Sequence, residues 1–207
     1  MMRKIIAIKL IIVFILIFLS TTIILIFKEK NLSVSDKTPS PQYRIKGNKN
    51  ARIVIVEYSD FACPACAYMN EYLKNLLSYF PSDFVLYFKH LPLTNIHPNS
   101  FDAALWAECV GMKENKFFEF GDILFKNRSE WASSNDYIKL FEKYTKQVGA
   151  DLNKVKECYK NQETVELVKS DIKKADEMRL DSTPTFFVNG RMAVGGSSLI
   201  EEIKKEK

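Results

Sequence analysis

The sequence predicts an α/β domain whose small sheet is interrupted by a long helical insertion. A buried strand at 51–58, an amphipathic helix and a second strand at 84–89 form the pattern of a parallel βαβ unit. Residues 98–180 then carry helix signals and no strand signal. A β-hairpin at 185–194 and a final helix close the chain. We therefore expect one folded domain over residues 43–207.

The first 30 residues, 1–30, are expected to lie outside this domain. Basic residues precede an apolar run at 10–27 that is about long enough to span a bilayer. The run is followed by Lys28 rather than by a small-residue cleavage site, which favours an uncleaved signal-anchor over a cleaved signal peptide. The positive charges place the N-terminus in the cytoplasm, so we expect a periplasmic or otherwise extracytoplasmic domain, anchored in the inner membrane if the segment is kept. Residues 31–42 are polar, contain two prolines and predict a linker.

The charge pattern argues against a nucleic-acid partner. The net charge of +5 is modest, and part of it lies beside the apolar run. Lysines and glutamates alternate over 153–174 as they do on a solvated helix face, so no basic patch is predicted.

The strand at 51–58 is expected at the centre of the sheet. Residues 53–56 are apolar at every position, so helices should cover both faces of the strand. Glu57 interrupts this pattern. It is either at the frayed, solvated end of the strand or a buried acid with a raised pKa close to the cysteines that follow, and the residues alone favour neither alternative.

The helices are predicted from apolar spacing and from their stop signals. The first begins at Pro64 and stops before Pro81. Phenylalanines at 117, 118, 120 and 125 suit a buried helix face better than a ligand pocket. Helices of the insertion are expected at 98–110, 115–126 and 135–148, followed by one long or broken helix at 151–180.

The last part of the chain predicts a hairpin and a helix. Residues 185–188 form an apolar strand, Asn189-Gly190 favours a type I′ turn, and 191–194 returns antiparallel. Gly195 then opens the C-terminal helix.

Two cysteines, Cys63 and Cys66, stand where the central strand passes into its helix. Pro64 suits the first helical position, so Cys63 should be the N-cap and Cys66 should lie one turn further, with the two sulfur atoms adjacent. A thiolate at Cys63 would face unpaired backbone N–H groups and the positive end of the helix dipole, which lower its pKa below about 8.5. This arrangement predicts a redox-active disulfide in which Cys63 is the partly exposed, attacking sulfur.

Zinc binding and an inert core pair are the other interpretations of two cysteines at this spacing. A zinc site needs about four ligands. Beyond this pair, the chain offers only four isolated candidates, Cys109, Cys158, His90 and His97. We therefore expect no metal and no organic cofactor.

Four stretches together resemble one known family. They are Glu-Tyr-Ser-Asp-Phe-Ala-Cys-Pro-Ala-Cys, Phe-Lys-His-Leu-Pro-Leu, Ala-Ala-Leu-Trp-Ala-Glu-Cys and Thr-Pro-Thr-Phe-Phe-Val-Asn-Gly. Over residues 43–207 the chain resembles the thioredoxin-fold disulfide oxidoreductases of the DsbA-like family. The resemblance implies a thioredoxin fold with the helical insertion at about 98–180.

The resemblance also implies roles for five residues. Cys63 would be the nucleophile and Cys66 the buried resolving cysteine. Pro184 would be a cis-proline that faces the disulfide, and Thr183 would offer backbone groups to an extended substrate. Glu57 would lie beneath the active site and help to move the proton of the second cysteine. The chain departs from DsbA in having no histidine between its cysteines, which bears on how oxidising the pair is.

The expected activity is thiol:disulfide exchange that promotes disulfide bond formation in exported proteins. Unfolded exported proteins with free thiols would be the substrates, and a membrane redox partner would reoxidise the reduced enzyme. Three alternatives stay open: a reductase or isomerase, a peptide-binding holdase with a vestigial disulfide, and a membrane-tethered metal chaperone that uses Cys63, Cys66 and a histidine such as His97.

The remaining cysteines, Cys109 and Cys158, predict a second, structural disulfide within the insertion. Four cysteines in an oxidising compartment divide naturally into one active pair and one remote pair. The alternative is two free buried thiols.

Overall fold

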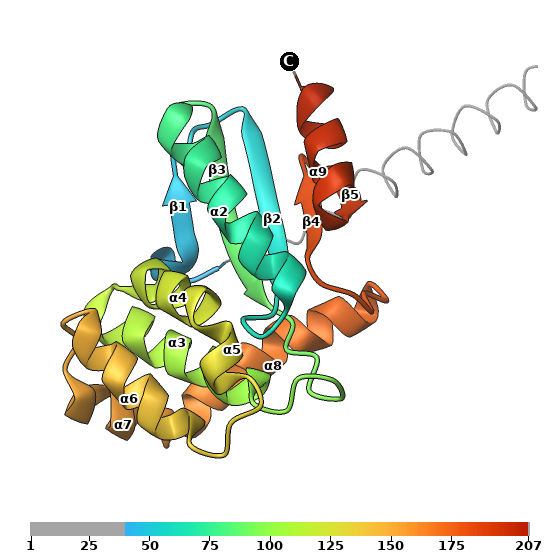
Figure 1. Ribbon diagram of the computed structural model, residues 1–207. Helices are drawn as coiled ribbons and strands as arrows, with labels where there is room; N and C mark the ends of the chain where they lie inside the picture. Colours follow the sequence, from blue (N-terminus) through green and yellow to red (C-terminus); the bar gives the residue numbers. More distant parts are fainter. Residues whose placement is uncertain (1–39, 207) are drawn as a thin grey trace, which may run out of the picture. The chain divides into compact units, whose positions relative to one another are not determined.

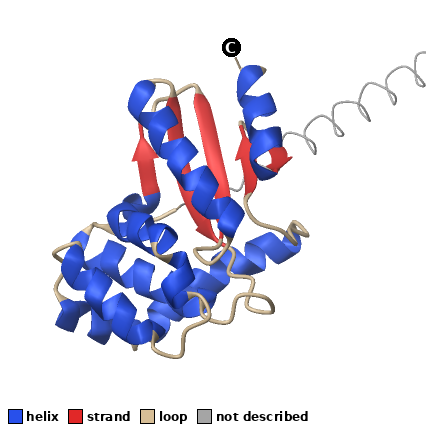
Figure 2. Ribbon diagram, in the orientation of Figure 1, coloured by secondary structure: helices blue, strands red, loops and turns tan. Residues whose placement is uncertain are grey.

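The structure is a computed structural model that describes residues 40–206, and these form an α/β unit (Figure 1). One mixed sheet contains β1 (Ile45–Gly47), β2 (Ile53–Ser59), β3 (Phe84–His90), β4 (Thr185–Val188) and β5 (Arg191–Val194). The helical elements are η1 (Gln42–Arg44), α2 (Pro64–Tyr79), α3 (Ser100–Glu114), α4 (Phe117–Lys126), α5 (Arg128–Trp131), α6 (Tyr137–Gln147), α7 (Leu152–Tyr159), α8 (Gln162–Glu177) and α9 (Gly195–Lys204). Helices α3 to α8 form a block at one end of the sheet (Figure 2).

The sheet has the strand order β1-β3-β2-β4-β5. Strands β2 and β3 are parallel and are joined by α2, so the predicted βαβ unit is confirmed. Strand β4 pairs antiparallel with β2, and β5 pairs antiparallel with β4. Asn189 and Gly190 have φ angles of 47° and 82°, as a type I′ turn requires. The central position of β2 and the C-terminal hairpin are therefore as predicted.

Strand β1 was not predicted. It pairs antiparallel with β3, with Ile45 opposite Tyr87. Three residues are too few to show an alternating pattern, so only the pairing with β3 defines this strand. Gly47 then turns the chain away with a φ of 99°, and a Cβ atom there would lie 2.4 Å from the carbonyl oxygen of Phe84. Glycine is needed at this turn.

Helices α2 and α9 cover one face of the sheet. Ile53 and Ile55 of β2 point to this face together with Phe186 of β4. They pack against Leu73 of α2 and Leu199 of α9, and all five side chains are buried. This cluster forms the core of the sheet.

The opposite face is covered less completely than the sequence predicted. Tyr58 at the end of β2 and Phe187 of β4 are buried in a cluster with Ala175 of α8. Val54 and Val56 are only half-buried. Among the described residues, this face of β2 is most completely buried at Tyr58, at the end nearest the cysteines. The sequence could not show this difference, because the residues on both faces of the strand are apolar.

The insertion is helical throughout, and its boundaries lie within a few residues of those predicted, apart from the additional short helix α5. The helix predicted at 151–180 as long or broken is broken. Helix α7 ends at Tyr159 and α8 begins at Gln162. Between them Asn161 acts as an N-cap, because its side-chain oxygen accepts a hydrogen bond from the backbone N–H of Glu163.

The phenylalanine cluster lies in the core of the insertion, as predicted. Phe117, Phe120 and Phe125 are buried in one cluster with Trp106. Phe118 is half-buried at its edge. The active-site loop enters the same cluster through Phe61, whose ring centroid lies 5.0 Å from that of Phe125. The insertion therefore packs directly against the residues that precede the cysteines.

A disulfide joins Cys109 of α3 to Cys158 of α7, as predicted. The two Cα atoms are 5.6 Å apart, the residues are 49 positions apart in the sequence, and both side chains are buried. The bond therefore links two helices inside the insertion and lies outside the sheet.

A buried group of charged residues connects η1 and β3 to the insertion, and the sequence did not predict it. Arg44 is 1% exposed, and its Nε lies 3.0 Å from Oε1 of Glu108. The same guanidinium pairs with Asp171 of α8. Glu108 also lies 2.9 Å from Nε2 of His90. Since a buried charge is tolerated only with partners, these residues hold the insertion against the sheet edge.

The predicted anchor at 1–30 and most of the predicted linker at 31–42 lie outside the described residues. Over residues 40–206, no helix is long and apolar enough to cross a membrane. The end of the predicted linker belongs to the folded unit, since Ser40 is 8% exposed and its hydroxyl donates to the carbonyl of Phe88 at 3.5 Å.

Candidate active site

The two cysteines lie where β2 passes into α2. Cys63 is the N-cap, with φ −77° and ψ 126°, and Pro64 is the first helical residue, as predicted. Both cysteines are free thiols, so the structure is the reduced form. Cys66 is 0% exposed and Cys63 is 7% exposed. Cys63 is thus the more accessible thiol, but the prediction that it is partly exposed was wrong, because a neighbouring loop covers it.

That loop precedes β4. The peptide bond between Thr183 and Pro184 is cis, as predicted. The carbonyl oxygen of Thr183 lies 3.4 Å from the sulfur of Cys63, although the two residues are 120 positions apart in the sequence. The pairing of β4 with β2 brings them together. The loop thereby covers the N-cap residue, whose side chain is left only 7% exposed.

The Cys63 thiol is strongly acidic in this environment. Its pKa is lowered to about 5, first because the Cys66 thiol donates a hydrogen bond to the thiolate. Backbone N–H groups of Ala65 and Cys66 also face the sulfur, while burial opposes the shift. At neutral pH the sulfur is therefore a thiolate, which is the reactive form.

The Cys66 thiol has the opposite property. Burial, followed by its hydrogen bond to Cys63 and the negative charges of Cys63 and Glu57, raises its pKa well above the ordinary value. The two sulfur atoms thus share one proton at neutral pH, and it stays on Cys66.

Glu57 is a buried acid, which decides between the two alternatives left open by the sequence. It is 3% exposed and lies between Phe88 of β3 and Phe186 of β4. Burial, and then the charge of Cys63, raise its pKa to about 7. Its Oε1 has no hydrogen-bond partner among the described residues. A carboxyl group with this pKa can exchange a proton near neutral pH.

Metal ligation receives no support from the position of His97. A metal chaperone would need this side chain beside the cysteines, but its Nδ1 lies 2.8 Å from the carboxylate of Asp60. Across residues 40–206, no group of three or more histidine, cysteine, aspartate or glutamate side chains is placed to hold a metal ion.

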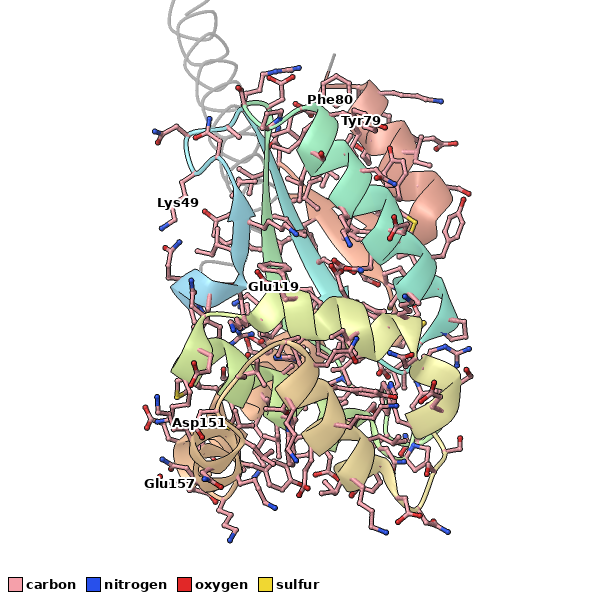
Figure 3. All side chains as sticks on the ribbon, turned by 60° about the vertical axis from the view of Figure 1, so that its left-hand side comes forward. Lys49, Tyr79, Phe80, Glu119, Asp151 and Glu157 are labelled. Atoms are coloured by element: carbon pink, nitrogen blue, oxygen red, sulfur yellow. A yellow bond between two sulfur atoms is a disulfide. The ribbon has the colours of Figure 1, made fainter. Side chains whose placement is uncertain are left out.

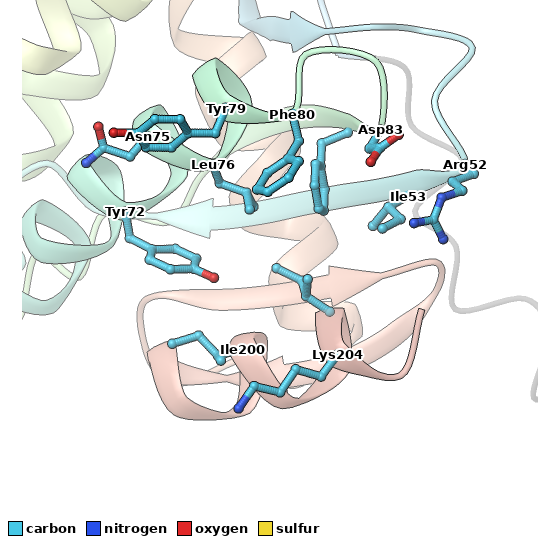
Figure 4. Close-up of a pocket in the computed structure, with 12 residues that line it drawn as sticks. Arg52, Ile53, Tyr72, Asn75, Leu76, Tyr79, Phe80, Asp83, Ile200 and Lys204 are labelled. Carbon is cyan, nitrogen blue, oxygen red and sulfur yellow. The ribbon is translucent and has the colours of Figure 1, made fainter. Parts of the chain in front are cut away.

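Two cavities lie along the groove between α2 and α9. One of about 360 Å³ adjoins the cysteines and is lined by Ala65, Tyr68, Met69, Gly196, Ser197 and Ile200. The other, of about 390 Å³, lies at the far end of α2 among apolar side chains such as Tyr72, Leu76 and Phe80 (Figure 4). Tyr79 and Phe80 mark this end of the helix, away from the insertion (Figure 3). Only the first cavity adjoins the cysteines, so we assign the second no part in their chemistry.

The fold and the site define a thioredoxin-fold protein with a Cys-X-X-Cys pair beside a cis-proline. The family model described as thioredoxin matches residues 40–205, and the chain belongs to this family. A match to the Na(+)/H(+) antiporter NhaA 1 of Mycobacterium sp. (strain KMS) has 33% identity over 165 residues and covers 77% of this chain. A Rickettsia typhi protein, provisionally named a protein-disulfide oxidoreductase, is 29% identical over 157 residues, or 70% of this chain.

The chain spans only part of these curated relatives. It covers 26% of the antiporter and 54% of the Rickettsia protein. The match therefore does not assign antiport activity to this chain.

Solved structures share the fold. Oxidised BdbD from Bacillus subtilis superposes with a TM-score of 0.68 at 22% identity, covering 79% of this chain and 89% of that one. The thiol-disulfide exchange protein alpha-DsbA2 from Wolbachia pipientis superposes with a TM-score of 0.69 at 18% identity, covering 88% and 94%. The predicted resemblance to DsbA-like proteins is thus confirmed at the level of the fold.

Proposed function

We propose that the chain is an extracytoplasmic thiol:disulfide oxidoreductase that donates a Cys63–Cys66 disulfide to exported proteins. The observation that carries the proposal is the asymmetry of the pair: the pKa of Cys63 is lowered to about 5, while that of the adjacent Cys66 is raised. A disulfide made from such a pair has one sulfur that leaves readily and one that keeps a proton. The names of the Rickettsia relative and the Wolbachia structure, which refer to disulfide chemistry, support the same class.

In the proposed reaction, a substrate thiolate attacks the sulfur of Cys63 in the oxidised pair. The bond between Cys63 and Cys66 breaks, a mixed disulfide forms, and Cys66 leaves as a thiolate. Because burial raises the pKa of Cys66, this thiolate takes up a proton, and we assign its delivery to Glu57, whose pKa is raised to about 7. A second substrate thiolate then attacks the substrate sulfur and releases the Cys63 thiolate. The substrate gains a disulfide, and its two electrons remain in the reduced cysteine pair.

Thr183 and Pro184 form the other side of the site. The carbonyl of Thr183 is directed at Cys63, so an extended substrate segment that reaches this sulfur must pass the same backbone. Both residues directly precede β4, and the peptide bond between them is cis. We assign both residues to substrate binding.

The proposed direction is oxidation of the substrate. Whatever stabilises the Cys63 thiolate stabilises only the reduced protein, so it makes the disulfide easier to reduce and the protein a stronger oxidant. The reductase or isomerase alternative would instead work with the pair kept reduced. The partner that reoxidises the enzyme is proposed to be a membrane protein, and residues 1–30 are proposed to export and anchor the domain, as their sequence predicts.

The test is a single-turnover reaction. The oxidised full-length protein, mixed with a reduced and unfolded test protein, should transfer about one disulfide per enzyme molecule, and free thiols should disappear in step. Cys63→Ser should abolish this transfer, whereas the exposed variant Glu119→Gln should leave it unchanged. Thiol loss that survives in Cys63→Ser would contradict the exchange mechanism. No disulfide transfer by the parent protein, together with equal binding of the unfolded test protein by the parent and Cys63→Ser, would favour the holdase alternative.

A further inference from the structure

The carboxylate of Asp60 is buried and joins two loops. The residue is 1% exposed. Its Oδ1 accepts a hydrogen bond from the backbone N–H of Ala62 at 2.8 Å. Its Oδ2 accepts from the backbone N–H of Leu93 at 2.9 Å and lies 2.8 Å from Nδ1 of His97. Since an ionised carboxylate can only accept, Nδ1 is the nitrogen of His97 that carries the proton. The loop before the cysteines is thereby tied to the loop after β3.

The main chain of Asp60 contacts both cysteines. Its carbonyl accepts the backbone N–H of Cys63 at 3.0 Å. Its backbone hydrogen bond to Cys66 lowers the pKa of that thiol, against the larger effect of burial. A movement of Asp60 would therefore change the surroundings of both sulfur atoms at once.

His97 is held firmly in place. Its side chain is 18% exposed, and its backbone N–H donates to the carbonyl of Leu93 at 2.9 Å. Its own carbonyl accepts hydrogen bonds from the N–H and the hydroxyl of Ser100, the first residue of α3. The backbone of His97 is thus fixed by the start of the insertion. None of the reaction steps proposed above uses its imidazole.

We propose that Asp60 and His97 are positioning residues for thiol-disulfide exchange. The imidazole N–H holds the Asp60 carboxylate, and Asp60 holds the backbone on which Cys63 and Cys66 are set. This inference rests on the proposed function. It makes the start of the helical insertion part of the redox site, because His97 is fixed by α3.

The expected effect has a definite sign. Without the donor of His97, the carboxylate of Asp60 keeps two of its three hydrogen bonds, and its negative charge is less compensated. A less compensated carboxylate and a looser loop both disfavour a thiolate at Cys63. The disulfide should therefore become harder to reduce.

The experiment measures the redox equilibrium of the full-length protein with glutathione. His97→Ala should shift the equilibrium constant about tenfold toward the oxidised protein, which corresponds to about 30 mV. His97→Asn keeps an amide N–H close to the position of Nδ1, so it should recover most of this loss. Asn95→Ala is the matched control, an exposed residue of the same loop, and should behave as the parent protein.

Two results would overturn the proposal. One is an unchanged equilibrium in His97→Ala together with a lower melting temperature, which would leave the pair a structural role only. The other is an equal shift in His97→Asn and His97→Ala. If His97→Ala does not fold, His97→Gln replaces it, since its amide reaches past the position of Nδ1. A parent protein that equilibrates with glutathione but oxidises no protein substrate would contradict the proposed function, and the comparison of these variants would still decide the positioning role.

Discussion

Cys63 and Glu57 acquire their reactivity from opposite physical causes. The thiol is acidified because donors converge on its sulfur, chiefly Cys66 and then the backbone N–H groups at the start of α2. The carboxyl is made less acidic because the sheet removes it from solvent. The helix terminus was visible in the sequence as Pro64 after Cys63. The burial of Glu57 could not be predicted from the sequence, because it depends on which strands lie on either side of β2.

The acidity of Cys63 predicts a pH profile for alkylation. In the reduced protein, iodoacetamide should modify Cys63 rapidly at pH 8 and at pH 6, because its pKa is about 5 and it remains a thiolate at both. The rate should fall below pH 5. An unperturbed thiol, with a pKa near 8.5, would already slow about a hundredfold between pH 8 and 6. Peptide mass analysis should find Cys66 unmodified, and equal labelling of Cys63 and Cys66 would contradict the assignment of their roles.

The buried acid predicts a pH dependence of stability. With a folded pKa of about 7, raised from 4.5, Glu57 keeps its proton in the folded protein while the unfolded chain ionises. Its stabilising contribution is complete below pH 4.5 and is lost as the pH rises toward 7. Burial is the largest cause of this shift and is present in both redox forms, whereas the charge of Cys63 is present only in the reduced one. The oxidised protein should therefore lose at most on the order of 3 kcal/mol over this range through this residue.

Glu57→Gln should remove this loss of stability. Urea unfolding at pH 4.5 and pH 7 measures the free energy of unfolding, and the oxidised form is used because no active-site thiol then titrates. The exposed variant Glu119→Gln should keep the pH dependence of the parent protein. Parallel curves for the parent and Glu57→Gln would show that Glu57 is not the group responsible.

At the level of helices and strands, the active site is shaped by two elements that pack closely against it, α4 and β4. Helix α4 reaches the active-site loop because Gly121 leaves space, and a Cβ atom there would lie 3.1 Å from the ring of Phe61. Strand β4 delivers the loop of Thr183 and Pro184 to Cys63. Each contact joins segments that are distant in the sequence, so no local sequence pattern predicts it.

The structural disulfide acts at this scale. Replacing both Cys109 and Cys158 by alanine opens a loop between residues 49 positions apart. The chain-entropy model then predicts a loss of about 4 kcal/mol in the free energy of unfolding. Urea unfolding of the double variant measures this loss. The control variant replaces Cys63 and Cys66 by serine. A disulfide between these two residues closes only a small ring, so its removal should lower the free energy of unfolding far less. An unchanged unfolding midpoint in the alanine variant would contradict the stabilising role.

For the whole molecule, the redox state of two sulfur atoms is linked to the stability of the fold. The folded pKa of Cys63 is depressed to about 5, so its thiolate stabilises the reduced protein above the unfolded pKa, and this contribution falls as the pH falls through 5. The disulfide form has no such group. Redox chemistry and folding are therefore coupled through one charge.

Thermal melts of the two redox forms test this coupling. The reduced protein should melt at the higher temperature at pH 8, and the difference should shrink as the pH approaches 5. Cys63→Ser has neither the thiolate nor a disulfide form, so its melting temperature should lack the rise between pH 5 and pH 8 that the Cys63 thiolate gives to the reduced protein. A clearly more stable oxidised form would contradict the proposed direction and favour the reductase alternative.

Features that depend on neighbouring residues could be predicted from the sequence. The βαβ unit follows from apolar spacing, the hairpin from Asn189-Gly190, and the reactive pair from Cys63 before a proline at a helix start. The pairing of Cys109 with Cys158 followed from the number of cysteines and from the expectation of an oxidising compartment. These features are visible in the chain because their causes act over a few residues, or because few partners exist.

The tertiary structure alone decided what burial and distant contacts create. It buried Glu57 and so raised its pKa, covered Cys63 with the loop of Thr183, and placed His97 beside Asp60. It also defined β1, whose three residues form a strand only beside β3. The physical reason is the same in each case. A pKa value, the exposure of a side chain and the pairing of an edge strand all depend on which segments pack together. Each of these contacts joins residues that are far apart along the chain or lie on different elements.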